Sequence, residues 1–404
     1  MIPFSPPYID QDVINEVIDT LKSGWITSGP KVKALEQEIC RLSNTPDVLC
    51  VNSATSGLMI SLRWFGVGPG DEVIIPAYTY AATALAVFHL GAKPVLADVN
   101  DDFNINIDCV KKLINSSTKA IIPVDIAGWP CDYDELHRLV NDREIITMFA
   151  PRFEEQKKLG RILLLSDAAH SIGAYYKNKP TGSITDISVF SLHAVKNVTT
   201  AEGGAICISL PKSFSGKEVY TKMKLMSLNG QTKDAYSKSN AGGWRYDIVL
   251  QGYKMNMPDV CAAIGLAQIR KYKKYLLVER KRVASHYVKR FSEFEWAILP
   301  PFQNIDKESS YHLFALRIKG FSETQRDLLI EEISKNGVSV NVHFIPLPLL
   351  KFFKNEGYKI ENYPQAYACY CCEISLPIYP QLDSEKVDFI VEVVIKCYKK
   401  VLNK

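Results

Sequence analysis

The chain has 404 residues, of which 47% are hydrophobic and 23% charged, a composition that excludes a disordered or fibrous protein. Its 48 basic and 44 acidic residues leave a formal net charge of +4, spread along the chain, so composition offers no electrostatic case for nucleic acid binding. The most apolar stretch, 81–92, is too short to span a bilayer, and we expect no membrane segment. Polar and Pro-rich sequence follows Met1 directly, which predicts a cytoplasmic protein without a secretory signal.

The first predicted helix carries one apolar stripe. Asp10 can cap its start, Gly24 can end it, and an extended segment at 25–30 follows. The stripe consists of Val13, Ile14, Val17, Ile18 and Leu21.

From about residue 50, short apolar runs alternate with helical stretches. Strands are predicted at 73–75, 94–97, 120–124 and 162–165, and helices at 58–65, 81–90 and 133–140. This alternation is typical of an α/β fold with a mostly parallel sheet covered on both faces. The charged segment 141–160, which contains Pro151, interrupts the alternation and is predicted to be a surface insertion.

The pattern changes beyond residue 267 and predicts a smaller α+β domain. We expect a long basic helix, a strand at 311–318, a helix opening with the capping box Ser322-Glu323-Thr324-Gln325, a strand at 338–342 after Gly337, and a final helix from about 384 to 402. The predicted large domain therefore covers residues 1–268 and the small domain residues 269–404.

Ten cysteines in a chain of this length do not form a dense disulfide scaffold. Cys369, Cys371 and Cys372 lie close together, but no second Cys or His pair stands at zinc-finger spacing. We expect reduced structural thiols and no metal site.

Lys196 and Asp167 are the most informative pair of residues. Lys196 lies in a loop between the apolar runs 187–190 and 205–208, where partial desolvation would lower its pKa and favour the free amine. Asp167 follows the strand predicted at 162–165, at the edge of the sheet where ligands gather. Pyridoxal phosphate (PLP) enzymes need one lysine for a Schiff base and one carboxylate to keep the pyridine nitrogen protonated. We therefore interpret the pair as a PLP site, over the alternatives of a surface lysine and a capping aspartate.

Two further segments fit this interpretation. Small residues at 53–57 precede a helix, so backbone N–H groups and the Thr55 hydroxyl could bind the cofactor phosphate, although an ordinary helix cap looks the same. Tyr80 follows the strand at 73–75 and could cover a flat ring, or it could pack in the core.

Taken together, these segments resemble the DegT/DnrJ/EryC1/StrS family, sugar aminotransferases with the aspartate-aminotransferase-like PLP fold type I. The likeness covers nearly the whole chain and includes 24–31, 52–55, 76–79, 167–170, 191–196, 202–204, 252–259 and 342–347.

The resemblance implies a homodimer with active sites at the subunit interface. In such a site Lys196 forms the Schiff base, Asp167 pairs with the pyridinium, and His170 lies beside the phenolic oxygen of the ring. The resemblance also implies that Ser191, Ala54 and Thr55 hold the phosphate and that Tyr80 stacks on the ring.

The implied reaction moves an amino group from glutamate to a keto-sugar, most often nucleotide-linked, for amino-sugar, surface polysaccharide or antibiotic-sugar biosynthesis. Relatives that act as dehydratases have histidine in place of the lysine, so Lys196 favours amino transfer. A dehydratase or eliminase, and a PLP-binding regulatory protein without turnover, are the alternatives.

The chain departs from the common family pattern at 252–257, where the asparagine expected to reach the partner's phosphate is displaced and Asn256 is the candidate replacement. Trp25, Thr27, His193 and His343 resemble substrate-pocket positions, although a histidine in a strand-to-loop segment is often structural.

Overall fold

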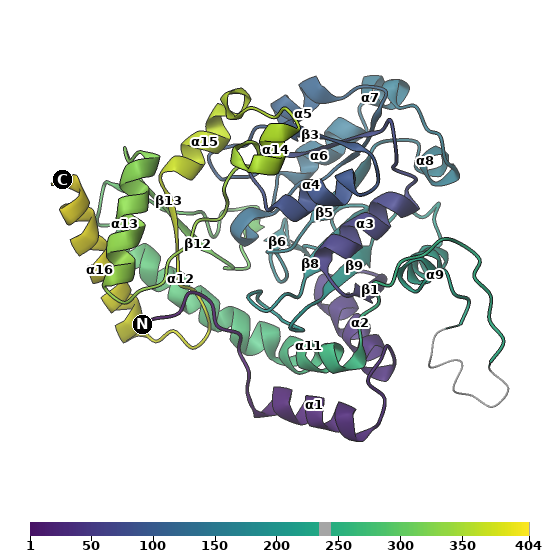
Figure 1. Cartoon of the computed structure of the whole chain (residues 1–404), viewed down its shortest axis with the longest axis horizontal. Helices are drawn as coiled ribbons and strands as arrows, with labels where there is room; N and C mark the ends of the chain where they lie inside the picture. The colour runs from purple at the N-terminus through teal and green to yellow at the C-terminus, as the bar shows by residue number, and fades with distance from the viewer. Residues whose placement is uncertain (234–243, 404) are drawn as a thin grey trace.

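The computed structural model describes residues 1–233 and 244–403 (Figure 1). Its largest sheet has seven strands in the order β1-β9-β8-β5-β4-β2-β3. The strands are β1 (Asp47–Val51), β2 (Glu72–Pro76), β3 (Lys93–Ala97), β4 (Thr118–Ile121), β5 (Leu163–Asp167), β8 (Ile187–Ser191) and β9 (Gly204–Ile208). All neighbours pair in parallel except β9, which is antiparallel to both β8 and β1. The predicted mostly parallel sheet is therefore confirmed, and each strand predicted between 73 and 165 is present within a few residues.

Helices cover both faces of this sheet. In β1, Leu49 and Val51 belong to the core on one face, while Val48 and Cys50 pack with the helices on the other face. The helices around the sheet are α2 (Pro30–Ser43), α3 (Ala54–Trp64), α4 (Ala81–Phe88), α5 (Ile107–Leu113), α6 (Tyr133–Val140), α9 (Gly216–Ser227) and α11 (Asp259–Lys271), with a 3-10 turn at Ile126–Gly128. The strands are apolar along their length because both faces are buried.

Helix α1 (Gln11–Lys22) forms as predicted and lies along α11 (Figure 1). The Asp10 side chain accepts a hydrogen bond from the Val13 N–H, and Gly24 turns the chain with a φ of +73°. Its apolar stripe is only partly covered, because Ile14, Ile18 and Leu21 are 41–55% exposed.

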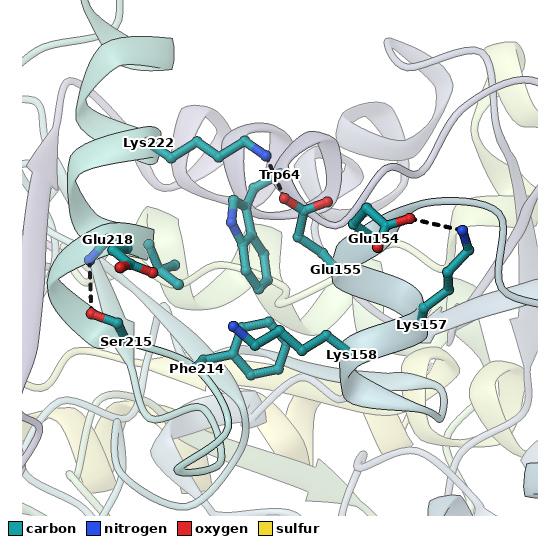
Figure 2. A pocket seen from close by; sticks show the side chains of 10 residues that line it. Trp64, Glu154, Glu155, Lys157, Lys158, Phe214, Ser215, Glu218 and Lys222 are labelled. Atoms are coloured by element: carbon teal, nitrogen blue, oxygen red, sulfur yellow. Dashed lines mark hydrogen bonds and ion pairs between the residues drawn. The ribbon is translucent and has the colours of Figure 1, made fainter.

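The segment predicted as an insertion contains the short helices α7 (Arg143–Met148) and α8 (Glu154–Leu159). Side chains of α8 and α9 line a groove of about 520 Å³. Figure 2 shows Trp64 between them. Glu155 forms an ion pair with Lys222, and the Lys158 Nζ lies 4.8 Å from the centre of the Phe214 ring. Ile145 and Phe149 of this segment are also buried in the core beside the large sheet, so apolar, polar and cation–π contacts all hold the segment in place.

The C-terminal part is a second layer of helices on a small antiparallel sheet. Its strands are β10 (Ala297–Ile298), β12 (Phe314–Ile318) and β13 (Glu373–Leu376), and its helices are α12 (Leu277–Phe291), α13 (Glu323–Lys335), α14 (Lys351–Asn355), α15 (Pro364–Cys371) and α16 (Ser384–Leu402). Both halves of the predicted capping box are present at the start of α13. A third small sheet joins β11 (Lys307–Glu308), β6 (Tyr175–Tyr176) and β7 (Lys179–Pro180), and 3-10 turns lie at Leu347–Leu349 and Ile360–Asn362.

One strand predicted for this part is absent, and another is shorter than predicted. The segment 338–342 is not a strand, because Val338 and Asn341 form only isolated bridges, with Ile2 and Ser375. The backbone of Ile2 hydrogen-bonds with Gly337 and Ser339 there, and β13 supplies the third strand of the sheet instead. The strand predicted at 311–318 begins only at Phe314, since Tyr311 has a φ of +55° that a strand does not allow.

The predicted boundary at residue 268 falls inside α11. Gln268 is buried, accepts from the Thr199 N–H at 2.9 Å and donates to the Tyr8 carbonyl at 2.6 Å. A π-helical turn at Tyr272–Leu276 then leads into α12, so one nearly continuous helical path joins both parts. The division into two domains stays a prediction.

In the part of the chain that the structure describes, no helix has the length and apolar character needed to cross a membrane.

Candidate active site

A cavity of about 460 Å³ lies where the ends of β5 and β8 meet the C-terminal part. Nine of the twelve candidate residues line it, from segments that are far apart in sequence. They are Ala54, Thr55, Tyr80, Asp167, His170, Ser191, His193, Lys196 and His343.

Lys196 lies in the loop after β8, as predicted. Its backbone N–H donates to the His193 carbonyl at 2.9 Å, which closes a tight turn below the side chain. Burial lowers the pKa of Lys196 to about 8, and the negative charge of Asp167 partly opposes that shift. More of the amine is therefore neutral near physiological pH than in an ordinary lysine, and the neutral form can act as a nucleophile or base.

Asp167 is the last residue of β5 and is buried in the wall of the same cavity. Its Oδ2 accepts a hydrogen bond from the Thr83 hydroxyl at 2.8 Å, and its Oδ1 accepts from the Ala169 N–H at 3.3 Å. Burial raises the pKa of Asp167, whereas Thr83, the Ala169 N–H and Lys196 act in the opposite direction. The carboxylate is thus held in place by neutral donors, and within residues 1–233 and 244–403 no ion pair engages it, so it can accept a cationic partner.

Thr83 was not predicted as a site residue. It lies on α4, which the sequence identified only as an apolar helix. The sequence signal was a threonine inside that apolar stretch. Its partner Asp167 lies 84 positions away, so no local pattern connects the two.

The N-terminus of α3 is open to the cavity at Ala54 and Thr55. Ser53 caps the helix by accepting from the Ser56 N–H at 3.1 Å, while the preceding N–H groups have no acceptor within the helix. A Cβ atom on Gly204 would lie 2.6 Å from the Ala54 nitrogen, so only glycine lets β9 pass this close. Together with the Ser191 hydroxyl, the residues present fit a bound phosphate.

Two neighbouring histidines, His170 and His312, also line the cavity. The rings of His170 and His312 lie 4.4 Å apart, and both are buried. The His170 Nδ1 accepts from the Ala127 N–H at 3.2 Å, so the neutral ring carries its proton on Nε2. Burial, together with the nearby Lys196 charge, holds the pKa of His170 well below its usual value. His170 can therefore act as a neutral hydrogen-bond donor.

His312 was also missed, although it lines the cavity. The Asn197 amide nitrogen donates to the Ser310 carbonyl at 2.8 Å and to the Tyr272 hydroxyl at 3.1 Å, so the Asn197 Oδ1 is the atom that faces His312. Since this oxygen can only accept, the His312 Nδ1 donates to it at 2.8 Å. The sequence suggested only a strand at this position.

Tyr80 and His193 lie at the mouth of the cavity. Tyr80 is 63% exposed with its ring 5.7 Å from Phe344, so the alternative of a core tyrosine is excluded. The His193 Nε2 lies 3.6 Å from a carboxylate oxygen of Glu202, and both side chains are exposed. Their roles toward a ligand stay predictions.

Trp25, Thr27 and Asn256 lie together but do not line the cavity. The Asn256 amide donates to the Ser28 hydroxyl at 2.7 Å, and the Trp25 indole donates to the Ser28 carbonyl at 3.2 Å. The Thr27 carbonyl accepts from the Asp259 N–H at 3.3 Å. One chain alone therefore does not bring these three residues to Lys196.

Comparisons with known proteins bear directly on this site. The model of the DegT/DnrJ/EryC1/StrS aminotransferase family matches residues 7–149 and 153–395. The chain belongs to this family. The predicted enzyme class, an aminotransferase, is thereby confirmed.

Solved structures extend the likeness to the fold. Spr1654 of Streptococcus pneumoniae, assigned as a sugar aminotransferase, is 44% identical with a TM-score of 0.95, covering 100% of this chain and 98% of that chain. Its solved forms include one with PLP and one with PMP, the amino form of the cofactor. Helicobacter pylori PseC, an aminotransferase involved in pseudoaminic acid biosynthesis, is 28% identical with a TM-score of 0.84 over 99% of both chains. The predicted fold class and the cofactor expected for such proteins are confirmed.

A curated relative points to a biological setting. The spore coat polysaccharide biosynthesis protein SpsC of Bacillus subtilis is 33% identical over 399 residues, which are 97% of this chain and 96% of that protein.

The cysteines and possible metal ligands can also be located. Among residues 1–233 and 244–403, no three His, Cys, Asp or Glu side chains are grouped to hold a metal ion. The ten cysteines are free thiols, and Cys369, Cys371 and Cys372 lie at the end of α15 before β13.

Proposed function

We propose that this chain is a PLP-dependent aminotransferase that moves an amino group from glutamate to a nucleotide-linked keto-sugar in the cytoplasm. The observation that carries the proposal is the presence of Lys196 and Asp167 in one cavity, the lysine with a pKa lowered to about 8. When bound, PLP supplies an aldehyde that reacts with amines and a ring that accepts electrons.

The residues around the cavity have separate tasks. The Lys196 Nζ would supply the amine for the aldehyde, and it would take the proton from the donor's α-carbon and deliver it to the former aldehyde carbon of the cofactor, C4′. Asp167, fixed by Thr83, keeps the pyridine nitrogen protonated, and the His170 Nε2–H donates to the phenolic oxygen. The first turn of α3, with Thr55 and Ser191, binds the phosphate.

A sugar substrate agrees with the rest of the lining. His193 and His343 offer hydrogen-bonding groups, while Phe344 offers an apolar ring face. SpsC and PseC act in polysaccharide and pseudoaminic acid biosynthesis, respectively, which supports a sugar acceptor. The nucleotide linkage rests on the resemblance to the family.

We include a homodimer in the proposal. The exposed side chains Ile14, Ile18 and Leu21 give α1 an uncovered apolar surface that a second copy would bury. In the dimer, Trp25, Thr27 and Asn256 would extend toward the partner's cavity, and Asn256 would reach the partner's phosphate.

The test is a panel of nucleotide-linked keto-sugars, assayed with glutamate and the holoenzyme. We expect glutamate alone to give one 2-oxoglutarate per site and the spectrum of the amino form of the cofactor, and one panel member to restore the starting spectrum. Turnover of a sugar without 2-oxoglutarate would contradict the proposal and support elimination. Sedimentation measures the dimer separately, and Ile18→Asp should shift it to monomer.

A further inference from the structure

The ring of His343 is connected to a buried carboxylate through one hydroxyl. The His343 Nδ1 lies 3.0 Å from the Ser375 Oγ, and the Ser375 Oγ lies 2.5 Å from the Glu373 Oε1. Ser375 and Glu373 are fully buried on β13, while His343 lines the cavity. The chain of three groups therefore runs from the protein interior to the proposed sugar site.

The position of the His343 ring is fixed from several sides. Its backbone N–H donates to the Glu373 Oε2 at 3.1 Å, and its carbonyl accepts from the Tyr78 hydroxyl at 2.7 Å. The Phe4 ring stacks on it with centroids 5.3 Å apart. Because the His343 Nδ1 is hydrogen-bonded to the Ser375 hydroxyl, Nε2 is the ring nitrogen that can bind a ligand.

A serine hydroxyl has one proton to donate, so the protonation state of Glu373 decides the direction of both hydrogen bonds that link Glu373, Ser375 and His343. An ionised Glu373 can only accept, so Ser375 donates to it, His343 donates from Nδ1, and Nε2 keeps a lone pair. A protonated Glu373 can donate to Ser375, which then donates to Nδ1, so the imidazole proton resides on Nε2. The change takes up one proton at Nε2 and passes one from Nδ1 through Ser375 to Glu373. The imidazole is neutral in both states.

Both states of Glu373 are accessible near neutral pH. Burial raises its pKa to about 8, against the opposing effects of Ser375, the His343 N–H and two arginines. The titratable and charged groups around it are Arg317 on β12, Arg326 on α13, Cys369 on α15, Tyr78 and His343. Burial and Lys196 hold the pKa of His343 at about 3, so the ring itself does not become a cation.

We propose that Glu373, acting through Ser375, selects the tautomer that His343 presents to the sugar: a hydrogen-bond acceptor when Glu373 is ionised and a donor when it is protonated. This inference rests on the proposed function for the identity of the ligand. A keto oxygen can only accept, so it binds the donor form, whereas a sugar hydroxyl also binds the acceptor form. Glu373 and Ser375 are thus positioning residues for substrate recognition.

The direct test is nitrogen NMR of the holoenzyme labelled with ¹⁵N-histidine, titrated from about pH 6 to about pH 10. His343→Asn identifies the signals. We expect the His343 Nε2 to change from protonated to unprotonated with a midpoint near the pKa of Glu373, about 8, with Nδ1 changing in the opposite sense.

Three variants separate the relay from general effects. Glu373→Gln keeps the shape but does not titrate, and Ser375→Ala removes the link, so both should abolish the tautomer change. Glu332→Gln, which alters another buried glutamate beside Lys400 in the same part of the fold, should leave it intact. A single His343 tautomer throughout the wild-type titration, or a change that persists in both relay variants, overturns the proposal.

Kinetics add an independent readout. In Ser375→Ala we expect KM for the keto-sugar to rise about three- to tenfold, the effect of one hydrogen bond, while the rate of the glutamate half-reaction is unchanged. An equal loss in both half-reactions indicates structural damage and contradicts a positioning role. Absence of the glutamate half-reaction in the wild type refutes the proposed function, whereas the NMR result tests the relay alone.

Discussion

The cavity has two walls of different construction. One wall, from the large sheet, carries the ionisable groups Asp167, at the end of β5, and Lys196, in the loop after β8. The other carries the neutral rings of His312 and His343 on irregular segments fixed by hydrogen bonds. We infer that the first wall performs chemistry through shifted pKa values and the second recognises the substrate through fixed donors and acceptors. Substitutions should therefore affect kcat at the first wall and KM at the second.

The largest effect is expected for Lys196→Ala. Loss of the amine removes both the covalent attachment and the proton transfer, so turnover should fall by more than about 10⁴-fold and the yellow chromophore should disappear. Absorbance and single-turnover assays measure both. Lys179→Ala, at an exposed lysine on β7, is the control and should behave as the wild type.

The second-largest effect is expected for Asp167→Asn. An amide cannot keep the pyridine nitrogen protonated, so we expect kcat to fall by roughly 10²–10³-fold while the cofactor still binds. Equilibrium binding of PLP, measured beside kcat, separates the two effects. A variant that binds PLP and retains wild-type kcat would refute the role of Asp167.

The pKa of Lys196 also predicts a stability change in the protein without cofactor. The folded state loses its proton near pH 8, whereas an unfolded lysine keeps it to about 10.5. The unfolded state binds more protons between these values, so this group makes stability rise with pH across that window, by about 3 kcal/mol. Urea unfolding of Lys196→Met should lack this rise relative to the wild type; parallel curves would contradict the lowered pKa.

Thr83→Val tests whether the hydrogen bond from Thr83 positions Asp167, and its expected effect is smaller. It removes the hydroxyl that donates to Asp167 while keeping a similar volume, so the pKa of Asp167 should rise further and kcat should fall about tenfold. Asp167→Asn provides the reference background, in which Thr83→Val should have little additional effect. Additive losses in the double variant would show that Thr83 acts elsewhere.

The smallest effect is expected at the mouth. His193 and Glu202 are exposed and 3.6 Å apart, so the pair contributes little in water. His193→Ala should change KM for the sugar less than about threefold with kcat unchanged. A large drop in kcat, measured at saturating sugar, would contradict this prediction and indicate that His193 takes part in the chemical step.

The same two walls explain what the sequence could predict. Strand runs with uniform apolar character located β5 and β8, and therefore the positions of Asp167 and Lys196 just beyond them. The second wall depends on long-range pairs such as Tyr78 with His343, which no local pattern reveals. His343 itself was suggested only by the resemblance to the family.

The strand predicted at 338–342 is absent because of distant parts of the chain. Whether 338–342 joins a sheet depends on Ile2, more than 300 positions away, and on the competing strand β13. Trp25, Thr27 and Asn256 illustrate another limit, because their predicted roles require a second copy of the chain.

The central claim is that the amine of Lys196 bonds covalently to PLP. The most direct measurement is borohydride reduction of the PLP-loaded protein, followed by digestion and peptide mass spectrometry. The account predicts one pyridoxyl group per chain, on the peptide that contains Lys196. A stable group on another lysine, or none in a protein that has bound PLP stoichiometrically, would contradict it.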